Sequence, residues 1–229
     1  MWNKAAWDAA ALVGFNVANP AAGGAGAFGN FTGTDRSYVL CTPQAINNGS
    51  EYYSTAVAWT YGIALPKICA RIQPRSFSVG TTGICYGLDL VNAFTTGHNA
   101  VAGGGYVPTL GGTNADAGRF FSIAADTRAS ANWIFGCGDG TTANWIDSGV
   151  AVTTGQDYIL TIDLFATNGA SVTFSILNVA TGVTTVKTLS THMPGTNIQL
   201  EPFIYAISYG VTPGTGAAYE YVYMEHNGG

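Results

Sequence analysis

The last ninety or so residues read as short strands separated by turns. Residues 157–165 precede a turn at 167–169, and polar and apolar residues alternate with period two through 171–176. Alternation on both sides of a Gly-containing turn is a β-hairpin signature. A further run at 219–223, Tyr-Glu-Tyr-Val-Tyr, also reads as a strand. A meander of such strands predicts an all-β, antiparallel two-sheet sandwich.

Shorter strands with longer loops are predicted upstream, and no segment repeats at a fixed period. The expected strands are residues 37–41, 51–61, 67–71, 76–79, 84–90, 120–124 and 133–136. Residues 96–114 form a long Gly-rich excursion, which in a compact domain is usually functional or ordered by a partner. We expect residues 36–229 to form a single sandwich domain.

Residues 1–35 differ from the rest of the chain. They begin with apolar residues near helical spacing and continue into the low-complexity stretch Asn-Pro-Ala-Ala-Gly-Gly-Ala-Gly at 19–26. Such a stretch cannot hold a packed core of its own. We interpret this zone as an extended docking arm, with Trp2, Trp7 and Phe15 as the expected contacts. An N-terminal strand and loop of the same sandwich is an equally good interpretation.

The chain carries few charges for its size. Only 9% of the 229 residues are charged, against about 25% in a typical globular domain. Much of the surface is therefore expected to be covered by neighbouring subunits. The net charge of −5, with no basic cluster beyond Arg71 and Arg75, argues against nucleic acid. No run approaches the roughly 18 apolar residues of a membrane span, and no secretory signal is evident, so we expect synthesis in a cytoplasm and no membrane partner.

No motif predicts a metal or a cofactor. Cys41, Cys69, Cys85 and Cys137 are widely spaced, and buried free thiols are favoured over two disulfides. A Gly-x-Gly-x-x-Gly match at 24–29 lacks the strand and helix that a dinucleotide site needs. The Asp-Gly-Thr-Thr-Ala-Asn sequence at 139–144 has oxygen ligands but lacks the further acids of a calcium loop, so a plain turn is favoured.

No catalytic constellation stands out either. A glycoside hydrolase needs two facing carboxylates, and on a strand these favour positions two or four apart. Glu220 and Glu225 are five apart, and Asp157 begins a strand, where turn capping is its ordinary role. The histidines, at 98, 192 and 226, are far apart and are interpreted as loop residues. We therefore expect a protein that is not an enzyme.

The aromatic residues are the remaining resource for binding. Exposed rings suit sugar faces and protein partners alike. Trp133, Trp145 and Tyr209 are the candidate surface or carbohydrate contacts. The tyrosines at 219, 221 and 223 are predicted to share one strand face, as a layer between the sheets in preference to a subunit contact.

Three segments together resemble a known group of proteins. These are residues 144–162, which contain Asp-x-Gly-Val-x-Val-x-x-Gly-x-x-Tyr-x-Leu-x-Ile, then 172–176 and 219–223. They resemble the concanavalin-like jelly-roll modules of bacteriophage virion proteins, in which this run leads into a hairpin and an Asp-Tyr-Val-Tyr strand closes the sheet. The chain departs from that pattern at Glu220, where the family often has Asp.

The resemblance implies a virion structural protein made in the host cytoplasm. The resemblance also implies a homotrimer. The short length, the absence of a coiled coil or repeats and the Gly/Ala-rich N-terminal arm favour a capsid decoration, cement or head-fibre protein that binds the major capsid protein or another virion protein. In this interpretation the loops near 96–118 face outward or grip a neighbour. The alternative is a tail-fibre or tailspike adhesin that binds host-surface carbohydrate. Fold analogy does not select between them.

Overall fold

The computed structural model describes two sets of residues. Strand backbone alone is described at 16–18, 30–33, 36–41, 48–53, 59–60, 203, 206–209, 218 and 220–226, and backbone with side chains at 65–75, 83–92, 107–115, 118–165, 167–202, 204–205, 217 and 219. The described residues form β-strands joined by turns, without a helix. Within this part of the chain there is accordingly no helix long and apolar enough to cross a membrane.

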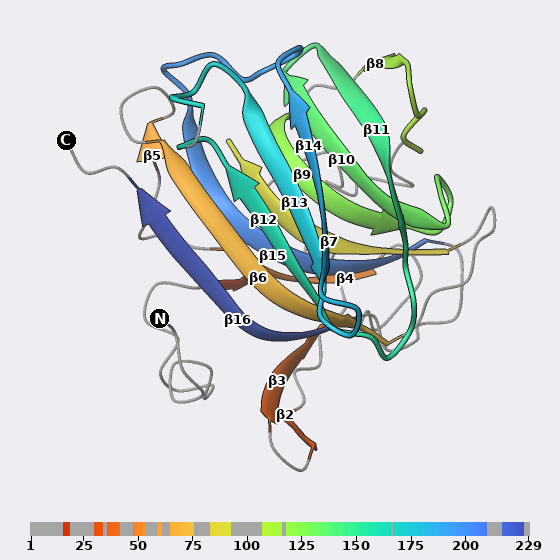
Figure 1. Ribbon diagram of the computed structural model, residues 1–229. Coiled ribbons are helices and arrows are strands. Elements are labelled where there is room, and N and C mark those ends of the chain that lie inside the picture. Colours follow the sequence, from red (N-terminus) through yellow and green to blue (C-terminus); the bar gives the residue numbers. More distant parts are fainter. Residues whose placement is uncertain are drawn as a thin grey trace.

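The strands form two antiparallel sheets that face each other (Figure 1). The nine-stranded sheet has the order β1 (Asn16–Ala18), β4 (Asn48–Tyr53), β15 (Gln199–Tyr209), β7 (Gly83–Val91), β9 (Arg119–Asp126), β10 (Asn132–Asp139), β11 (Thr142–Ala151), β8 (Thr113–Ala115), with β5 (Trp59–Thr60) also pairing with β15. The seven-stranded sheet has the order β14 (Val183–Leu189), β13 (Val172–Asn178), β12 (Tyr158–Asp163), β6 (Pro66–Pro74), β16 (Ala217–His226), β3 (Arg36–Cys41), β2 (Asn30–Gly33).

The main core lies between the sheets and follows from period-two patterning. In β6, β12 and β13 buried residues alternate with half-buried ones, so each strand sends every second side chain inward. Ile68, Leu160 and Phe174 represent this inner face, and each is fully buried. Phe174 stacks on Phe135 of the opposite sheet at a centroid distance of 5.1 Å, which joins the two layers.

The centre of the nine-stranded sheet is buried on both faces. β7, β9 and β10 are almost continuously buried, so their outward side chains form a second apolar cluster, which we call the outer layer. The outer layer consists of Cys85, Val91, Phe120, Ala124, Ile134, Ala143, Trp145 and Tyr205, with Leu110 and Ala129 packed against it. Glycines make room for its rings: a Cβ at Gly136 would lie 2.5 Å from the Trp145 indole.

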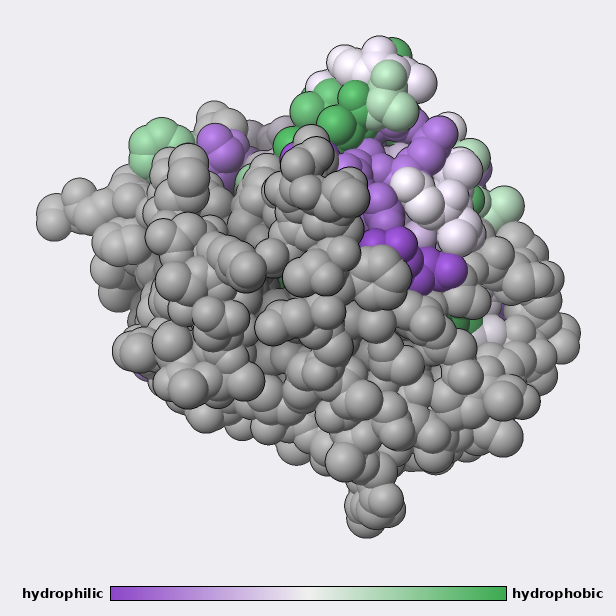
Figure 2. All heavy atoms as spheres, turned by 90° about the horizontal axis from the view of Figure 1, so that it is seen from below, coloured by the Kyte–Doolittle hydropathy of each residue, from purple (hydrophilic) through white to green (hydrophobic). Residues whose placement is uncertain are grey.

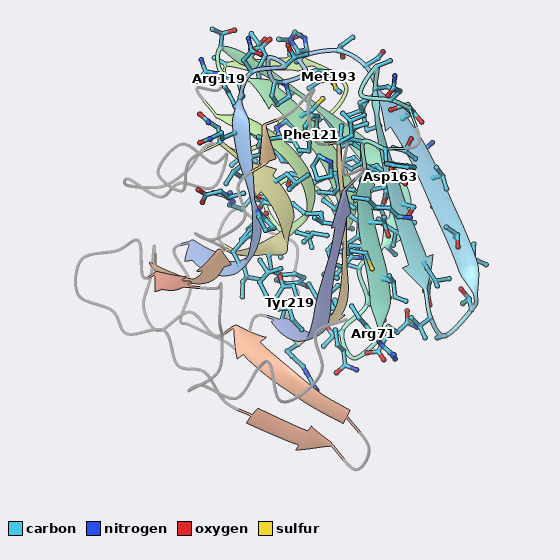
Figure 3. The ribbon with its side chains drawn as sticks, turned by 90° about the vertical axis from the view of Figure 1, so that its left-hand side faces the viewer. Arg71, Arg119, Phe121, Asp163, Met193 and Tyr219 are labelled. Carbon is cyan, nitrogen blue, oxygen red and sulfur yellow. The ribbon has the colours of Figure 1, made fainter. Side chains whose placement is uncertain are left out.

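One hydroxyl ties the two sheets together. The side chain of Tyr219, on β16 of the seven-stranded sheet, lies between the layers (Figure 3). Its hydroxyl lies 2.8 Å from the Gly87 carbonyl oxygen and 2.9 Å from that of Tyr205, both in the nine-stranded sheet. A buried phenol needs a partner of this kind, and here the partner fixes β16 against β7 and β15.

The sandwich predicted from the sequence is confirmed. The expected strands at 84–90, 120–124 and 133–136 appear as β7, β9 and β10, each longer than predicted and β10 twice as long. The hairpin predicted at 157–176 appears as β12 and β13. The strand expected at 76–79 lies outside the described residues. Part of the long excursion joins a sheet, because β8 pairs with β11.

Two pieces of the predicted N-terminal arm pair within the sandwich. β1 pairs with β4, and β2 pairs with β3, as in the alternative interpretation of an N-terminal strand and loop. The three expected docking residues, Trp2, Trp7 and Phe15, lie outside the described residues. The docking role of the arm therefore stays a prediction.

The tyrosine stripe predicted at the end of the chain is interrupted. Tyr219 is opposite Ile72 of β6, but a register shift then places Tyr221 opposite Arg71, the next residue back along β6. Such a bulge breaks period-two alternation, so the assumption that 219, 221 and 223 share one face is wrong for this strand. Tyr219 is buried as predicted for an inter-sheet layer, and the other two side chains lie outside the described residues.

Candidate functional site

Two of the three predicted carbohydrate-contacting aromatics are in the interior. Trp133 and Trp145 are fully buried, so the prediction that they lie on the surface is wrong. Trp133 lies between the sheets against Tyr86 and Tyr158, at centroid distances of 5.9 and 5.4 Å. Trp145 lies in the outer layer, 5.4 Å from the Phe120 ring. Burial of a large ring removes more apolar surface from water than burial of a small side chain, and a sheet with two apolar faces can bury rings on either side. The Tyr209 side chain lies outside the described residues.

Polar side chains gather instead at one end of the sandwich. We call this group the rim cluster; it consists of Arg119, Asp139, Thr141, Thr142, Asn144, Thr191 and His192. The residues come from the start of β9, the β10–β11 turn and the connection that follows β14. Arg119 and Met193 lie at this end of the molecule, and Arg71 lies at the other (Figure 3).

Asp139 is the centre of the rim cluster. Its Oδ1 accepts hydrogen bonds from the backbone N–H groups of Thr141 and Thr142, each 2.9 Å away, and from the Thr141 hydroxyl at 2.7 Å. Its Oδ2 accepts from the Thr142 hydroxyl at 3.0 Å and lies 3.2 Å from His192 Nδ1. The first three contacts fix the hairpin turn, as Asp commonly does. The Thr142 hydroxyl adds a fourth contact within the same hairpin, and His192 extends the network to a distant loop.

The electrostatics of Asp139 follow from these contacts. Partial burial alone would raise its pKa, but hydrogen bonds from Thr141, Thr142 and His192 outweigh it and hold the pKa well below the usual range. The carboxyl is therefore ionised wherever the protein is near neutral pH. Because its oxygens are occupied by these donors, Asp139 organises the rim and is a poor general acid.

His192 is held in an uncommon backbone conformation. Its φ is 54°, in the left-handed region that non-glycine residues seldom adopt. Nδ1 lies 2.7 Å from the Thr142 hydroxyl oxygen as well as 3.2 Å from Asp139 Oδ2. Since the Thr142 hydroxyl donates to Asp139, Nδ1 must carry the proton for every contact to be satisfied. In the neutral ring, Nε2 is then a hydrogen-bond acceptor.

Two further contacts hold the connection after β14 in place. The Cys137 thiol donates to the Thr191 carbonyl oxygen at 2.9 Å, and the Asn144 side-chain amide donates to the Thr191 hydroxyl at 3.2 Å. These contacts join the connection to β10 and β11. The loop that carries His192 is therefore fixed to the nine-stranded sheet by side chains on both sides of the β10–β11 turn.

Arg119 supplies a positive charge beside this turn. Gly140 has a φ of 98°, and a Cβ there would lie 2.8 Å from Arg119 Nε, so the Arg119 side chain lies directly against the turn. Arg119 forms no salt bridge and no side-chain hydrogen bond among the residues that the structure describes. Its planar guanidinium is available to a ligand, because glycine leaves room for it at the surface.

Neutral hydrogen-bonding groups surround this charge. Thr141 and Thr191 are exposed, while Asn144 and His192 are half-buried. Hydroxyl, amide and imidazole groups both donate and accept, as a ligand rich in hydroxyls requires. Among the described residues, no three His, Cys, Asp or Glu side chains are grouped to hold a metal ion. The chemistry available at the rim is therefore direct hydrogen bonding.

Two acids on the seven-stranded side of the sandwich are paired with cations. Asp157, for which turn capping was expected, instead accepts hydrogen bonds from Arg71 and from Gln73 on the neighbouring strand β6. Asp163 lies 3.8 Å from the Lys67 ammonium. Both acids belong to the seven-stranded side of the sandwich, and each has its own cation. This arrangement stabilises strand pairing and differs from two carboxylates facing one sugar bond.

Other sequence predictions are confirmed locally. The plain turn expected at 139–144 is the β10–β11 turn, and His192 is a loop residue. Cys85 and Cys137 are buried free thiols, and Cys69 is a half-buried one. Cys41 and His98 lie outside the described side chains. No sequence pattern indicated Arg119, apart from the glycine that follows Asp139.

Known structures share this fold. The chain matches no protein-family model and no curated protein sequence. It is similar to a seed lectin isoform of Lotus tetragonolobus, with a TM-score of 0.59, 11% identity and 94% coverage of each chain. A legume lectin-like domain from Entamoeba histolytica has a TM-score of 0.58 at 12% identity, with 95% of this chain and 92% of that one covered.

A bacteriophage protein is also among the similar structures. The enzymatically active domain of tailspike protein 2 of bacteriophage CBA120 has a TM-score of 0.54 at 11% identity. The match covers 92% of this chain but 28% of the tailspike chain, so this protein spans less than a third of it. At these identities the likeness shows the fold alone. The concanavalin-like jelly-roll fold implied by the resemblance is thereby confirmed.

Proposed function

We propose that this protein is a non-catalytic, lectin-like module that binds host-surface carbohydrate through the rim cluster, as an adhesin of a bacteriophage particle. The observation that carries the proposal is the guanidinium of Arg119, which has no side-chain partner among the described residues and lies beside fixed hydroxyl, amide and imidazole groups. The lectin-like fold and the sequence resemblance to virion modules support it.

The rim suits this role better than either described sheet face. The centre of the nine-stranded sheet carries the buried outer layer, so its side chains are closed to a polar ligand. On the seven-stranded sheet, Arg71 and Lys67 already pair with acids. Only preorganised polar groups bind a sugar without a large ordering cost, and Asp139 provides that preorganisation at the rim.

The ligand contacts follow from what remains unused. Asp139 is occupied and the Thr141 hydroxyl donates to it, so the saccharide would contact the Arg119 guanidinium, the acceptor lone pairs of the Thr141 hydroxyl and the Nε2 atom of His192. An arginine among neutral groups favours a glycan that bears a carboxylate or phosphate, since guanidinium binds such groups in a bidentate manner. The acids described above are occupied by hydrogen bonds or cations, which favours binding without hydrolysis. The capsid-decoration role and the virion location stay predictions.

Binding of the full chain to an array of bacterial surface glycans tests the proposal. The variants are Arg119→Ala, which removes the charge, and Thr141→Ala, which removes an exposed rim hydroxyl. Thr181→Ala is the matched control, because Thr181 is also an exposed turn threonine but follows β13 at the opposite end. Thermal unfolding of each variant checks that the fold is kept.

The expected result is wild-type binding to a subset of acidic glycans, loss of binding in Arg119→Ala and weaker binding in Thr141→Ala. The control should bind as the wild type does. Wild-type protein that binds none of the glycans contradicts the function. Binding that survives both rim substitutions moves the site elsewhere on the protein.

A further inference from the structure

Strand β8 continues the rim cluster by one strand. Asn144, a member of the cluster, is directly opposite Thr113 of β8. Directly opposite residues of an antiparallel pair share one face of the sheet. Thr113 is exposed and therefore lies on the face from which the Asn144 amide donates to Thr191. Neither the Thr113 hydroxyl nor Asn144 Oδ1 has a hydrogen-bond partner among the described residues.

The turn that precedes β8 is held in place by a buried asparagine. Asn114 is only 7% exposed, and its Oδ1 accepts from the Thr109 N–H at 2.8 Å. Its amide donates to the carbonyl oxygens of Thr109 and Gly112 at 3.0 and 3.3 Å. The Gly111 N–H donates to the Trp145 carbonyl oxygen at 2.9 Å, which joins the turn to β11. These bonds order the turn before any ligand binds.

The surface above this turn is open. Gly111 has a φ of 72°, and a Cβ built there would meet no atom within 4 Å. At Gly112 the only atom within that distance would be a Thr109 methyl carbon, 3.9 Å away. Thr109 and Thr113, on either side of the two glycines, are both exposed. Two threonines thus flank an uncovered stretch of backbone beside the rim.

The rim cluster and β8 together are wider than one sugar ring. β9, β10, β11 and β8 are successive neighbours in the nine-stranded sheet. Because strands lie about 4.8 Å apart, the three spacings from Arg119 of β9 to Thr113 of β8 cover roughly 14 Å. Residues 107–115 carry no charge, whereas Arg119 is a cation. The surface therefore suits an anionic sugar at one side and a neutral sugar at the other.

We propose that β8 and its preceding turn form a second subsite, in which Thr113 and Asn144 bind a neutral sugar linked to the anionic one. The protein would then recognise an oligosaccharide in preference to a monosaccharide, and Thr113 would determine selectivity for chain length. This assignment rests on the proposed function, because it takes the rim as the place of the anionic sugar. It also gives a role to the described part of the Gly-rich excursion, a kind of loop that is usually functional.

Binding of the full chain to sugars of increasing length tests the proposal. The probes are glucuronic acid, galacturonic acid, N-acetylneuraminic acid and glucose 6-phosphate, each as the free sugar and as the disaccharide and trisaccharide in which it is linked to neutral hexoses. Thr113→Val keeps a β-branched side chain suited to a strand but removes the hydroxyl.

Thr184→Val is the matched control. Thr184 is also an exposed threonine of an edge strand, β14. It follows the β13–β14 turn at the end of the sandwich opposite the rim, where Figure 2 shows hydrophobic atoms beside hydrophilic ones.

The longer probes of a series that binds should bind about tenfold or more tightly than its free sugar. Thr113→Val should weaken binding of the longer probes about twofold to tenfold, as expected for one hydrogen bond, and leave the free sugar unchanged. The control should match wild type for every probe.

Two kinds of failure are distinguishable. Equal wild-type affinity at every length overturns the subsite while the proposed function stands. A Thr113→Val variant whose affinity falls equally at every length, or at none, does the same. Wild-type protein that binds no probe overturns the proposed function and the subsite together.

Discussion

Replacing Asp139 with alanine removes the group that organises the rim. The carboxylate takes part in five hydrogen bonds, four with Thr141 and Thr142 of the β10–β11 hairpin and one with His192. A typical intramolecular hydrogen bond contributes about 0.5–1.5 kcal/mol. The Asp139 side chain is 30% exposed, so water replaces part of the loss. We therefore expect Asp139→Ala to lower the free energy of unfolding by about 2–4 kcal/mol, near the lower bound of that sum.

Asp139→Asn distinguishes the contribution of the turn contacts from that of the contact with His192. Asparagine keeps the Oδ1 acceptor for Thr141 and Thr142, and its amide can donate to the Thr142 hydroxyl, which then donates to His192 Nδ1. The stability order should be wild type, then Asn, then Ala. The Asn variant also holds His192 in the other tautomer, so Nε2 becomes a donor and the glycan preference changes.

Urea unfolding at several pH values measures both effects. The folded-state pKa of Asp139 is lowered, so its contribution is present above the unfolded-state pKa, about 3.9, and is lost as the pH falls through the lower folded-state value. The gap between wild type and Asp139→Ala should thus be full at neutral pH and narrow in strong acid. A gap within about 0.5 kcal/mol at neutral pH, typical of a surface substitution, would show that the Asp139 carboxylate does not hold the rim together.

Three further results are expected. Gly136→Ala should lower the free energy of unfolding by about 1–3 kcal/mol, because the new Cβ would clash with the buried Trp145 indole. Equal urea midpoints for wild type and variant would contradict this packing. Asp126→Ala should lower the free energy of unfolding by about 3–5 kcal/mol in the same assay, because it removes the carboxylate that lies 2.6 Å from the buried Arg128 guanidinium. A loss under about 1 kcal/mol would show that water reaches this site. A thiol reagent should modify the native protein at Cys69 before Cys137, because burial raises the pKa of the Cys137 thiol to about 12. The reverse order, found by peptide mapping, would contradict the burial of Cys137.

The sandwich was predictable because alternation of polar and apolar residues identifies each half-buried strand from its own sequence. In β12 and β13 the inward face is set by period two alone, so the sequence predicts the hairpin without its partners. The burial of Trp133 and Trp145 was not predictable in this way. Trp133 belongs to β10, which is buried on both faces, so period two does not identify an inward face there. Trp145 belongs to β11, which does alternate, but alternation does not show that the outer layer covers the face that carries this ring. Gly136 and Gly138, which make room for the rings, were the available hint.

The rim could not be predicted because topology assembles it. Arg119, Asp139 and His192 are separated by 20 and 53 positions, and only the crossing from β14 to β15 brings His192 to the β10–β11 turn. The period-two interpretation of the closing tyrosines failed for a related reason. A single register shift after Tyr219 changes the alternation, and no residue type in that strand predicts the shift.

The structure of the protein bound to an acidic glycan from the array is the most direct test of the central claim. We expect the sugar at the rim, with its anionic group on the Arg119 guanidinium and hydroxyls within hydrogen-bond distance of Thr141 and His192. A glycan bound instead on the seven-stranded sheet beside Arg71 and Lys67, with the rim empty, would contradict it.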